Sequence, residues 1–229
     1  MSAPAAGISR RRAARFYDST VGKKIVMAVS GVVLFGYVVA HLLGNLQIFI
    51  GPDQINHYAA LLHASPPLLW TARIFLLIML FLHIWSSVQL ALRKWDARPI
   101  AYVKKRAVGS SYASRTMYWS GPIVLAFLIF HLLQFTAGII HPGSQFIEGD
   151  VYHNVVAGFQ VWWVSAWYIF AVSLLGVHLS HGISAMFQSL GLAHPRYTPL
   201  LNKAAVVIAT AIVLGFISVP ISVLLEVVK

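Results

Sequence analysis

The sequence predicts an all-α, polytopic membrane protein: a bundle of five transmembrane helices with a cytoplasmic N-terminus and an external C-terminus. Its composition excludes a soluble domain, because hydrophobic residues make up 59% of the 229 residues and charged residues only 10%. Soluble domains carry about 25% charged residues. The mean hydropathy is +0.75. Five apolar stretches are each long enough to cross the roughly 30 Å of hydrocarbon in a bilayer, which takes about 20 helical residues.

The predicted spans cover residues 24–50, 67–92, 120–140, 158–190 and 204–228. Gly51 and Pro52 end the first span, and Pro66 precedes the second. Pro122 is expected in the opening turn of the third, where proline costs no helical hydrogen bond. Pro220 lies inside the fifth span and is expected to kink it. Residues 1–20 form a basic cytoplasmic tail, and because no internal repeat is found, residues 1–229 are predicted to form a single domain.

The basic residues predict which helix ends face the cytoplasm. The N-terminal segment, the second-to-third connection and the fourth-to-fifth connection hold six, seven and two of the 17 Lys and Arg residues. Only Arg73 and Lys229 fall on the opposite side. Cytoplasmic loops are enriched in Lys and Arg, so these three segments are assigned to the cytoplasm. This signal and attraction to anionic membrane lipid explain the net charge of +11 without a nucleic acid, and the basic face could also dock an acidic soluble partner.

Histidine is the polar residue that needs an explanation, because ten occur in this apolar chain and ionisable groups inside a membrane are costly and usually functional. Four lie well inside the spans. At 1.5 Å per residue, His41 and His131 lie about 26 Å and 24 Å from the cytoplasmic ends of their helices, and His83 and His178 about 15 Å and 20 Å. The first and third spans therefore offer an outer pair, and the second and fourth an inner pair, roughly 5–10 Å apart in depth.

Two stacked histidine pairs are what two bis-histidine b-type haems require, since each iron takes one imidazole from each face and bundle ligands come from facing helices. A lone intramembrane histidine could instead hydrogen-bond a neighbouring helix or line a proton path, so this interpretation depends on the four together. Small residues that would let a flat macrocycle approach the backbone are Gly31, Gly36, Gly44, Ser86, Ser87, Gly176 and Gly182. Such residues are also ordinary in membrane helix packing.

The remaining polar residues have weaker predictions. His181 is treated as a neighbour of His178 on the same helix face. Arg73, one turn into the second span, is expected either to snorkel to the interface or to pair with a haem propionate. Five histidines lie in loops or at helix ends and are expected at the solvated surface, with contact to a quinone or a haem propionate as the alternative: His57, His63, His141, His153 and His194.

Two absences in the sequence narrow the function. The chain has no cysteine, which excludes disulfides, thiolate-held iron–sulfur clusters and covalent haem attachment. Every acidic residue lies outside the predicted spans or at their ends, whereas a secondary transporter or proton pump would normally place carboxylates within them. Both observations favour an electron conduit.

Four segments carry a resemblance to a known family: GKKIVMAVSGVVLFGYVVAHLLGNLQIF around His41, FLHIWSSVQLALR around His83, IFHLLQF around His131 and HLSHGISAMFQSLGL from His178. In this order and spacing, the chain resembles the cytochrome b membrane-anchor subunit of succinate:quinone oxidoreductases (succinate dehydrogenase/fumarate reductase), in the single-subunit, five-helix, di-haem form. The resemblance begins at about Arg15. It implies that His41 and His131 are the axial ligands of the distal haem, and that His83 and His178 are those of the proximal haem. Its fourth-helix pattern also matches His178, Gly182 and Gly191 rather than His181.

The resemblance further implies a role in electron transfer within complex II of a prokaryotic cytoplasmic membrane. A flavoprotein subunit with FAD would oxidise succinate, and an iron–sulfur subunit would dock on the basic face. Electrons would pass through the proximal and then the distal haem to quinone, with menaquinone expected. The chain would thus be the membrane subunit of an enzyme whose dicarboxylate chemistry is on a partner, and a higher-order oligomer of the complex is compatible with this role. Candidates for the haem or quinone environment are His181, Ser30 on the inner side, and Arg73 with the loop 54–63 on the outer side.

One departure and two alternatives accompany this assignment. Some fumarate-reducing relatives carry a glutamate two residues before the fourth-helix ligand, where this chain has Gly176, which favours succinate oxidation. The cytochrome b subunit of a formate dehydrogenase or hydrogenase stays open as another electron-transfer role, although the fourth-helix glycines and the fifth helix fit it less well. A haem-free membrane transporter or assembly anchor is the alternative from a different class.

Overall fold

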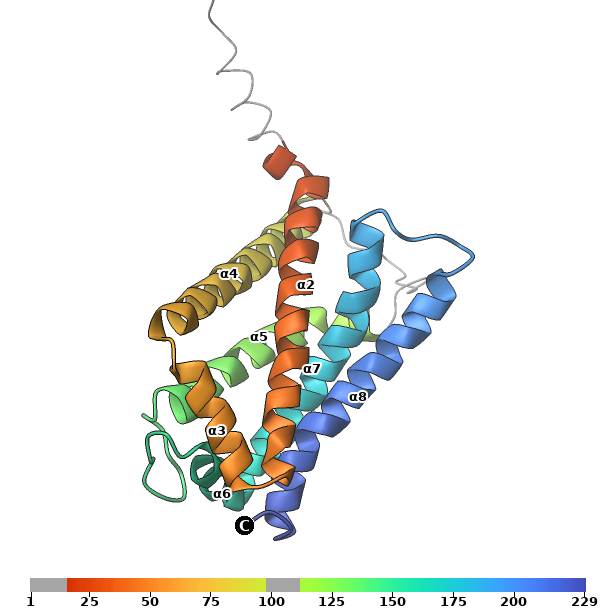
Figure 1. The fold of residues 1–229 in the computed structure, drawn as a ribbon. Helices are drawn as coiled ribbons and strands as arrows, with labels where there is room; N and C mark the ends of the chain where they lie inside the picture. The colour runs from red at the N-terminus through yellow and green to blue at the C-terminus, as the bar shows by residue number, and fades with distance from the viewer. Residues whose placement is uncertain (1–15, 98–111) are drawn as a thin grey trace, which may run out of the picture.

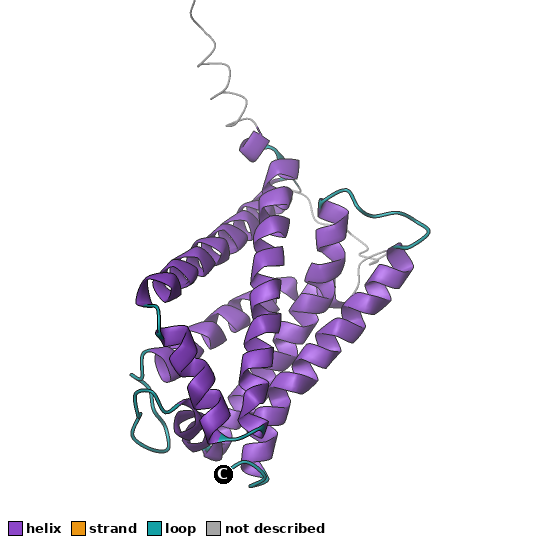
Figure 2. Cartoon of the chain, in the orientation of Figure 1, coloured by secondary structure: helices purple, strands orange, loops and turns teal. Residues whose placement is uncertain are grey.

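The computed structural model describes residues 16–97 and 112–229, and within them every regular element is a helix. Five of the described helices are long and apolar enough to cross a membrane, which confirms the predicted fold class (Figures 1 and 2). They are α2 (Thr20–Asn45), α4 (Pro66–Asp96), α5 (Tyr112–His131), α7 (Trp162–Ser189) and α8 (Thr198–Leu224). The shorter elements are η1 (Leu46–Phe49), α3 (Pro52–His63), the π-helical turn η2 (Leu132–Thr136) and α6 (Val151–Gln160).

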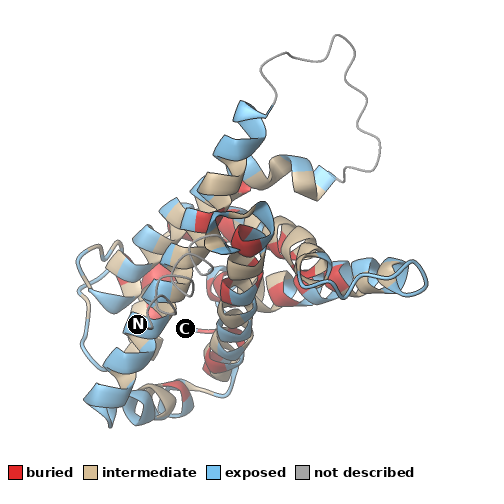
Figure 3. Cartoon of the chain, turned by 90° about the horizontal axis from the view of Figure 1, so that it is seen from above, coloured by how far each residue is buried: buried red, intermediate tan, exposed pale blue. Residues whose placement is uncertain are grey.

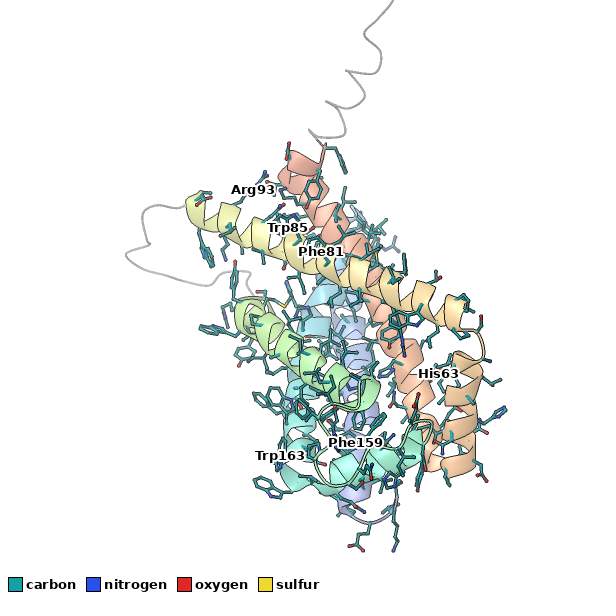
Figure 4. All side chains as sticks on the ribbon, turned by 90° about the vertical axis from the view of Figure 1, so that its left-hand side faces the viewer. His63, Phe81, Trp85, Arg93, Phe159 and Trp163 are labelled. Carbon is teal, nitrogen blue, oxygen red and sulfur yellow. The ribbon has the colours of Figure 1, made fainter. Side chains whose placement is uncertain are left out.

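The long helices alternate in direction along the chain, so their connections gather at two ends of the bundle. The start of α2, the end of α4 and the α7–α8 connection lie at one end, while α3, α6 and the C-terminus lie at the other (Figure 1). Figure 4 places Arg93 near the start of α2 and His63 at the opposite end of α4. Arg93 Nη1 lies 3.4 Å from Thr20 Oγ1, which joins the C-terminal end of α4 to the N-terminal end of α2.

Close helix packing is uneven across the bundle. α7 packs along both α8 and α5, and α2 packs along α4 and also contacts α7. The pairs α2–α5 and α4–α7 are not among the closely packed pairs. Seen from above, buried residues are sparse on α4 and α5 (Figure 3). On α4, the stacked rings of Phe81 and Trp85 are both exposed (Figure 4), as expected for a helix that faces lipid or another subunit.

Two apolar clusters hold the helices together. One lies at the end that carries α3 and α6, where Ile48, Ile55, Phe159, Tyr168 and Val219 bring five elements into contact. The other joins α2, α7 and α8 through residues that include Leu42, Leu179 and Ala209. These clusters hold α2, α5 and α7, which carry His41, His131 and His178, whereas α4 with His83 lies outside both clusters.

Three predicted boundaries differ from the structure. The third span was expected near residue 120, but α5 begins at Tyr112, so Pro122 lies inside the helix and its placement in the opening turn is wrong. Membrane helices tolerate an interior proline when neighbouring groups satisfy the freed backbone carbonyl. The fourth span was expected from residue 158, but the helix is interrupted at Val161, which separates α6 from α7. α8 begins at Thr198 and continues through Pro220.

The segment 54–63, expected to be a loop, is the helix α3. Gly51 precedes it with a φ of 135°, which favours glycine, Pro52 occupies its first turn, and Asp53 places a carboxylate near its N-terminus. These are ordinary signals for the start of a helix. Because the segment is too short to cross a bilayer, a search for spans passes over it.

Candidate functional site

The structure brings the four intramembrane histidines together as two pairs. His41 on α2 and His131 on α5 have ring centroids 5.7 Å apart. His83 on α4 and His178 on α7 have ring centroids 6.2 Å apart. Each pair joins two helices that do not pack closely against each other. These are the outer pair (His41 and His131) and the inner pair (His83 and His178) that the depth estimate predicts.

The spacing within each pair suits one metal ion between two imidazoles. A metal–nitrogen bond to histidine is about 2.0–2.1 Å long and the ring centroid lies about 1.1 Å behind the nitrogen, so two rings on opposite sides of an iron have centroids about 6.3 Å apart. The observed separations of 5.7 and 6.2 Å are close to this value. No group of three or more His, Cys, Asp or Glu side chains in residues 16–97 and 112–229 could hold a metal ion, so each pair offers two protein ligands.

His83 is oriented by a backbone group. Its Nδ1 lies 3.1 Å from the carbonyl oxygen of Met27 on α2. A carbonyl only accepts hydrogen bonds, so Nδ1 carries the proton and Nε2 keeps its lone pair for a metal. Gly31 makes room for the ring, since a Cβ there would lie 3.3 Å from His83 Cε1.

Ser30 lies next to this contact and is buried. Its hydroxyl donates to the carbonyl oxygens of Val26, at 2.7 Å, and Met27, at 3.1 Å. Ser30 and His83 therefore share the Met27 carbonyl. The structure thus places Ser30 beside a histidine of the inner pair, and its role in a haem or quinone environment stays a prediction.

His178 has an unpartnered nitrogen. Its Nδ1 is buried and has no hydrogen-bond partner among the described residues. One turn further along α7, a Cβ added to Gly182 would meet nothing within 4 Å. A buried nitrogen without a partner is rare in native proteins and calls for a ligand, water or ion. The unpartnered Nδ1 and the open space at Gly182 together fit a flat group beside His178. None of the ring contacts found in the described chain joins His83 to His181.

The other small residues divide into two kinds. Gly36 also faces open space, and the Ser86 hydroxyl is buried without a partner in the described chain. By contrast, Gly44 receives the ring of Tyr58, and Gly176 receives Val213 of α8. Ser87 donates to the carbonyl oxygen of Ile84 within its own helix. Glycine at 44 and 176 thus serves helix packing.

The outer pair lies among aromatic rings and is oriented by side chains. Tyr37 stacks on His41 with centroids 5.5 Å apart. The Tyr168 hydroxyl lies 3.3 Å from His131 Nδ1 and 2.9 Å from Gln134 Oε1. Gln134 is 2% exposed and belongs to the π-helical turn that follows His131. Turns of this kind occur frequently at functional sites.

Tyr168 and Gln134 are the functional candidates that sequence reasoning missed. Tyr168 lies 37 residues from His131, and no local motif links them. The one available signal was Gln134, a polar residue three positions after His131 inside an apolar segment, because residues at this spacing share a helix face.

Arg73 and the five peripheral histidines have different surroundings. Arg73 is half-buried, and its guanidinium lies 5.2 Å from the centroid of the Trp70 ring on the same helix. Both of its predicted roles stay predictions. His57, His63, His141 and His194 are exposed, while His153 is half-buried with its Nε2 3.0 Å from the Ser144 hydroxyl.

A hydrogen-bonded contact joins α3 to α6 at the end of the bundle nearest the outer pair. Asp150 Oδ1 accepts from the backbone N–H of His153, at 2.9 Å, and from the side-chain amide of Asn56, at 3.0 Å. These two hydrogen bonds, that of His153 first, lower the pKa of Asp150. The Tyr152 backbone N–H donates to Asn56 Oδ1 at 3.0 Å, so both sides of the Asn56 amide are used.

Comparison with protein-family models, with curated proteins and with solved structures found no match for this chain.

Proposed function

We propose that this chain is the di-haem cytochrome b membrane anchor of a succinate:quinone oxidoreductase. It would accept electrons from an iron–sulfur subunit and deliver them to quinone, with menaquinone expected, in the direction of succinate oxidation. The observation that carries the proposal is the presence of two histidine pairs at a separation that suits an iron, at two depths of one five-helix bundle. Haem b, when bound at each pair, supplies a one-electron redox centre.

The chain's own residues have separate tasks in this proposal. His83 and His178 hold the proximal haem, and His41 and His131 hold the distal one. The Met27 carbonyl keeps the proton on Nδ1 of His83 and so presents Nε2 to the metal.

The charge distribution supports a cytoplasmic docking face at the end nearer the inner pair. Lys24, Arg93 and Lys94 lie at this end of α2 and α4, whereas the Lys23 side chain is buried and donates to Gln89. Arg196 and Lys203 lie at or near the α7–α8 connection. Eight other basic residues counted toward this side fall outside the described residues: Arg10, Arg11, Arg12, Arg15, Arg98, Lys104, Lys105 and Arg106. An iron–sulfur partner would dock here, with FAD on a further subunit, in a prokaryotic cytoplasmic membrane.

The packing around Gly176 supports the direction of catalysis. A Cβ at this position would collide with Val213 on α8. The glutamate that some fumarate-reducing relatives carry here would therefore require the Val213 side chain to move. The chain thus lacks that carboxylate, and Val213 occupies the space beside Gly176.

The experiment is to purify the chain with whatever subunits accompany it and to record the absorption spectrum after adding succinate. The proposal predicts that succinate reduces both b-type haems, and that added menaquinone analogue reoxidises them. A cytochrome b of a formate dehydrogenase or hydrogenase would instead be reduced by formate or hydrogen and not by succinate. A transporter or assembly anchor would show no α-band at all, and either result would contradict the proposal.

A further inference from the structure

We infer that Tyr168 is a positioning residue for the outer pair, whose hydroxyl holds the Nδ1–H of His131 and so lowers the reduction potential of the iron that His131 binds. The inference rests on the proposed function, because it concerns a haem at this pair. It assigns a role at the outer pair to Tyr168 of α7, the helix that also carries His178 of the inner pair.

The direction of each hydrogen bond follows from counting protons. The Tyr168 hydroxyl has one proton and two neighbours, His131 Nδ1 at 3.3 Å and Gln134 Oε1 at 2.9 Å. An amide oxygen only accepts, so the hydroxyl proton goes to Gln134. The hydroxyl oxygen is then the acceptor for the N–H at Nδ1 of His131. Nε2 of His131 is left without a proton, in the form that binds a metal.

The surroundings of Tyr168 fix its ring in one position. The side chain is 6% exposed and makes edge contacts with Phe127 and Phe159 at centroid distances of 4.9 and 4.8 Å. Gln134 is held as firmly, because it is buried in the π-helical turn against Gly158 of α6. A Cβ on Gly158 would lie 2.7 Å from Gln134 Nε2. Residues of α5, α6, α7 and the π-helical turn therefore hold the Tyr168 hydroxyl next to the His131 imidazole.

The chemical consequence is a change in how strongly His131 donates electrons. A hydrogen-bond acceptor on the outer nitrogen of a metal-bound imidazole makes that imidazole a better electron donor. A better donor stabilises ferric over ferrous iron, so the reduction potential falls. If the Tyr168 hydroxyl served only to satisfy its own burial, its removal would leave the potential unchanged.

The test is Tyr168→Phe in the full chain with its haems, followed by a redox titration monitored at the b-type α-band. We expect both haems to be retained. The potential of the outer haem should rise by about 59 mV, which corresponds to a tenfold change in the ferric-to-ferrous equilibrium of a one-electron couple. The potential of the inner haem should stay unchanged. The low-spin ferric electron paramagnetic resonance signal of the outer haem should shift in the same sample.

Tyr37→Phe is the matched control. Tyr37 stacks on the other histidine of the same pair, but its hydroxyl makes no hydrogen bond within residues 16–97 and 112–229. The same change of Tyr to Phe there should leave both potentials in place. If Tyr168→Phe lost the outer haem, Gln134→Leu would decide the matter. It removes the acceptor that orients the hydroxyl and should raise the outer potential by a smaller amount.

The outcomes separate the two proposals. A wild-type chain without haem would overturn the proposed function itself. If the wild-type chain holds two haems and their potentials are unchanged in Tyr168→Phe, the role of Tyr168 alone is overturned. Where Tyr168→Phe loses haem, unchanged potentials in Gln134→Leu overturn it in the same way. A fall of the outer potential, or an equal shift in Tyr37→Phe, would also contradict it.

Discussion

The outer and inner pairs orient their histidines by different means. His131 depends on side chains, Tyr168 and Gln134, which come from α7 and the π-helical turn. His83 depends on the backbone carbonyl of Met27. The outer pair is packed among aromatic rings, whereas Gly31 lies against the His83 ring of the inner pair.

This difference has a consequence for how the two sites respond to mutation. A side-chain partner can be removed by substitution, whereas a backbone carbonyl stays in place. The outer pair should therefore be adjusted by changes in hydrogen bonding. The inner pair should respond mainly to changes in the space around it.

The largest effect is expected from removing a histidine itself. His41→Ala or His131→Ala should remove the outer haem, and His83→Ala or His178→Ala the inner one, so each variant should retain one of two haems. Haem content by pyridine haemochrome, with the α-band position, distinguishes the two. His181→Ala is the control and should keep both haems. If His181→Ala lost a haem while His178→Ala did not, the inner pair would be assigned to the wrong histidine.

A change in space should break the inner pair selectively. Gly31→Val places a branched side chain where a Cβ already lies 3.3 Å from the His83 ring. The ring must move from its carbonyl partner, and we expect roughly tenfold weaker retention of the inner haem, the lower end of what such changes cost in metal affinity. Haem retained during detergent dialysis measures this. The outer haem, whose ligand His41 lies on the same helix, should be retained; equal loss of both haems would point to general damage to α2.

Removing a hydroxyl at the inner pair should have a small effect, unlike at the outer pair. Ser30→Ala deletes a donor to the Met27 carbonyl but leaves the carbonyl itself for His83. The inner potential should therefore move much less than the tenfold equilibrium change expected for the outer haem in Tyr168→Phe. A redox titration of the two variants side by side makes the comparison. An equal or larger shift in Ser30→Ala would remove the distinction between backbone and side-chain support.

The smallest effect is expected at the contact between α3 and α6. Hydrogen bonds to ionised Asp150 lower its pKa, so their stabilisation is present above the unfolded pKa of about 3.9 and is lost as the pH falls through the folded value. Asp150→Ala should lower stability at pH 7 by at most about 1 kcal/mol, since solvent screens this exposed group. Thermal unfolding in detergent at pH 7 and pH 3 checks this. A difference between wild type and variant that persists unchanged at pH 3 would contradict it.

The sequence predicted those features that depend on long-range periodicity. Five spans follow from hydropathy, which integrates over about 20 residues and is insensitive to local detail. The pairing of His41 with His131 and of His83 with His178 follows from depth alone, because helices in a bundle run nearly parallel and rise by 1.5 Å per residue. Both observations use only distance along a helix.

Features that depend on tertiary contacts were missed. The start of α5 at Tyr112 was not predicted, because proline is common in the first turn of a helix and Pro122 was interpreted as such a residue. In the structure, the polar residues that precede Pro122 extend the helix beyond the apolar stretch. The break at Val161 lies within a continuous apolar segment. The hydrogen bonds of Tyr168 join segments 34 and 37 residues apart, and no periodic signal reports such a pairing.

The most direct test of this account is the haem content of the purified wild-type chain, measured by the pyridine haemochrome method against protein concentration. The two histidine pairs predict two b-type haems per chain, with an α-band that appears on reduction. A chain that carries no haem when expressed with adequate haem supply would contradict the central claim.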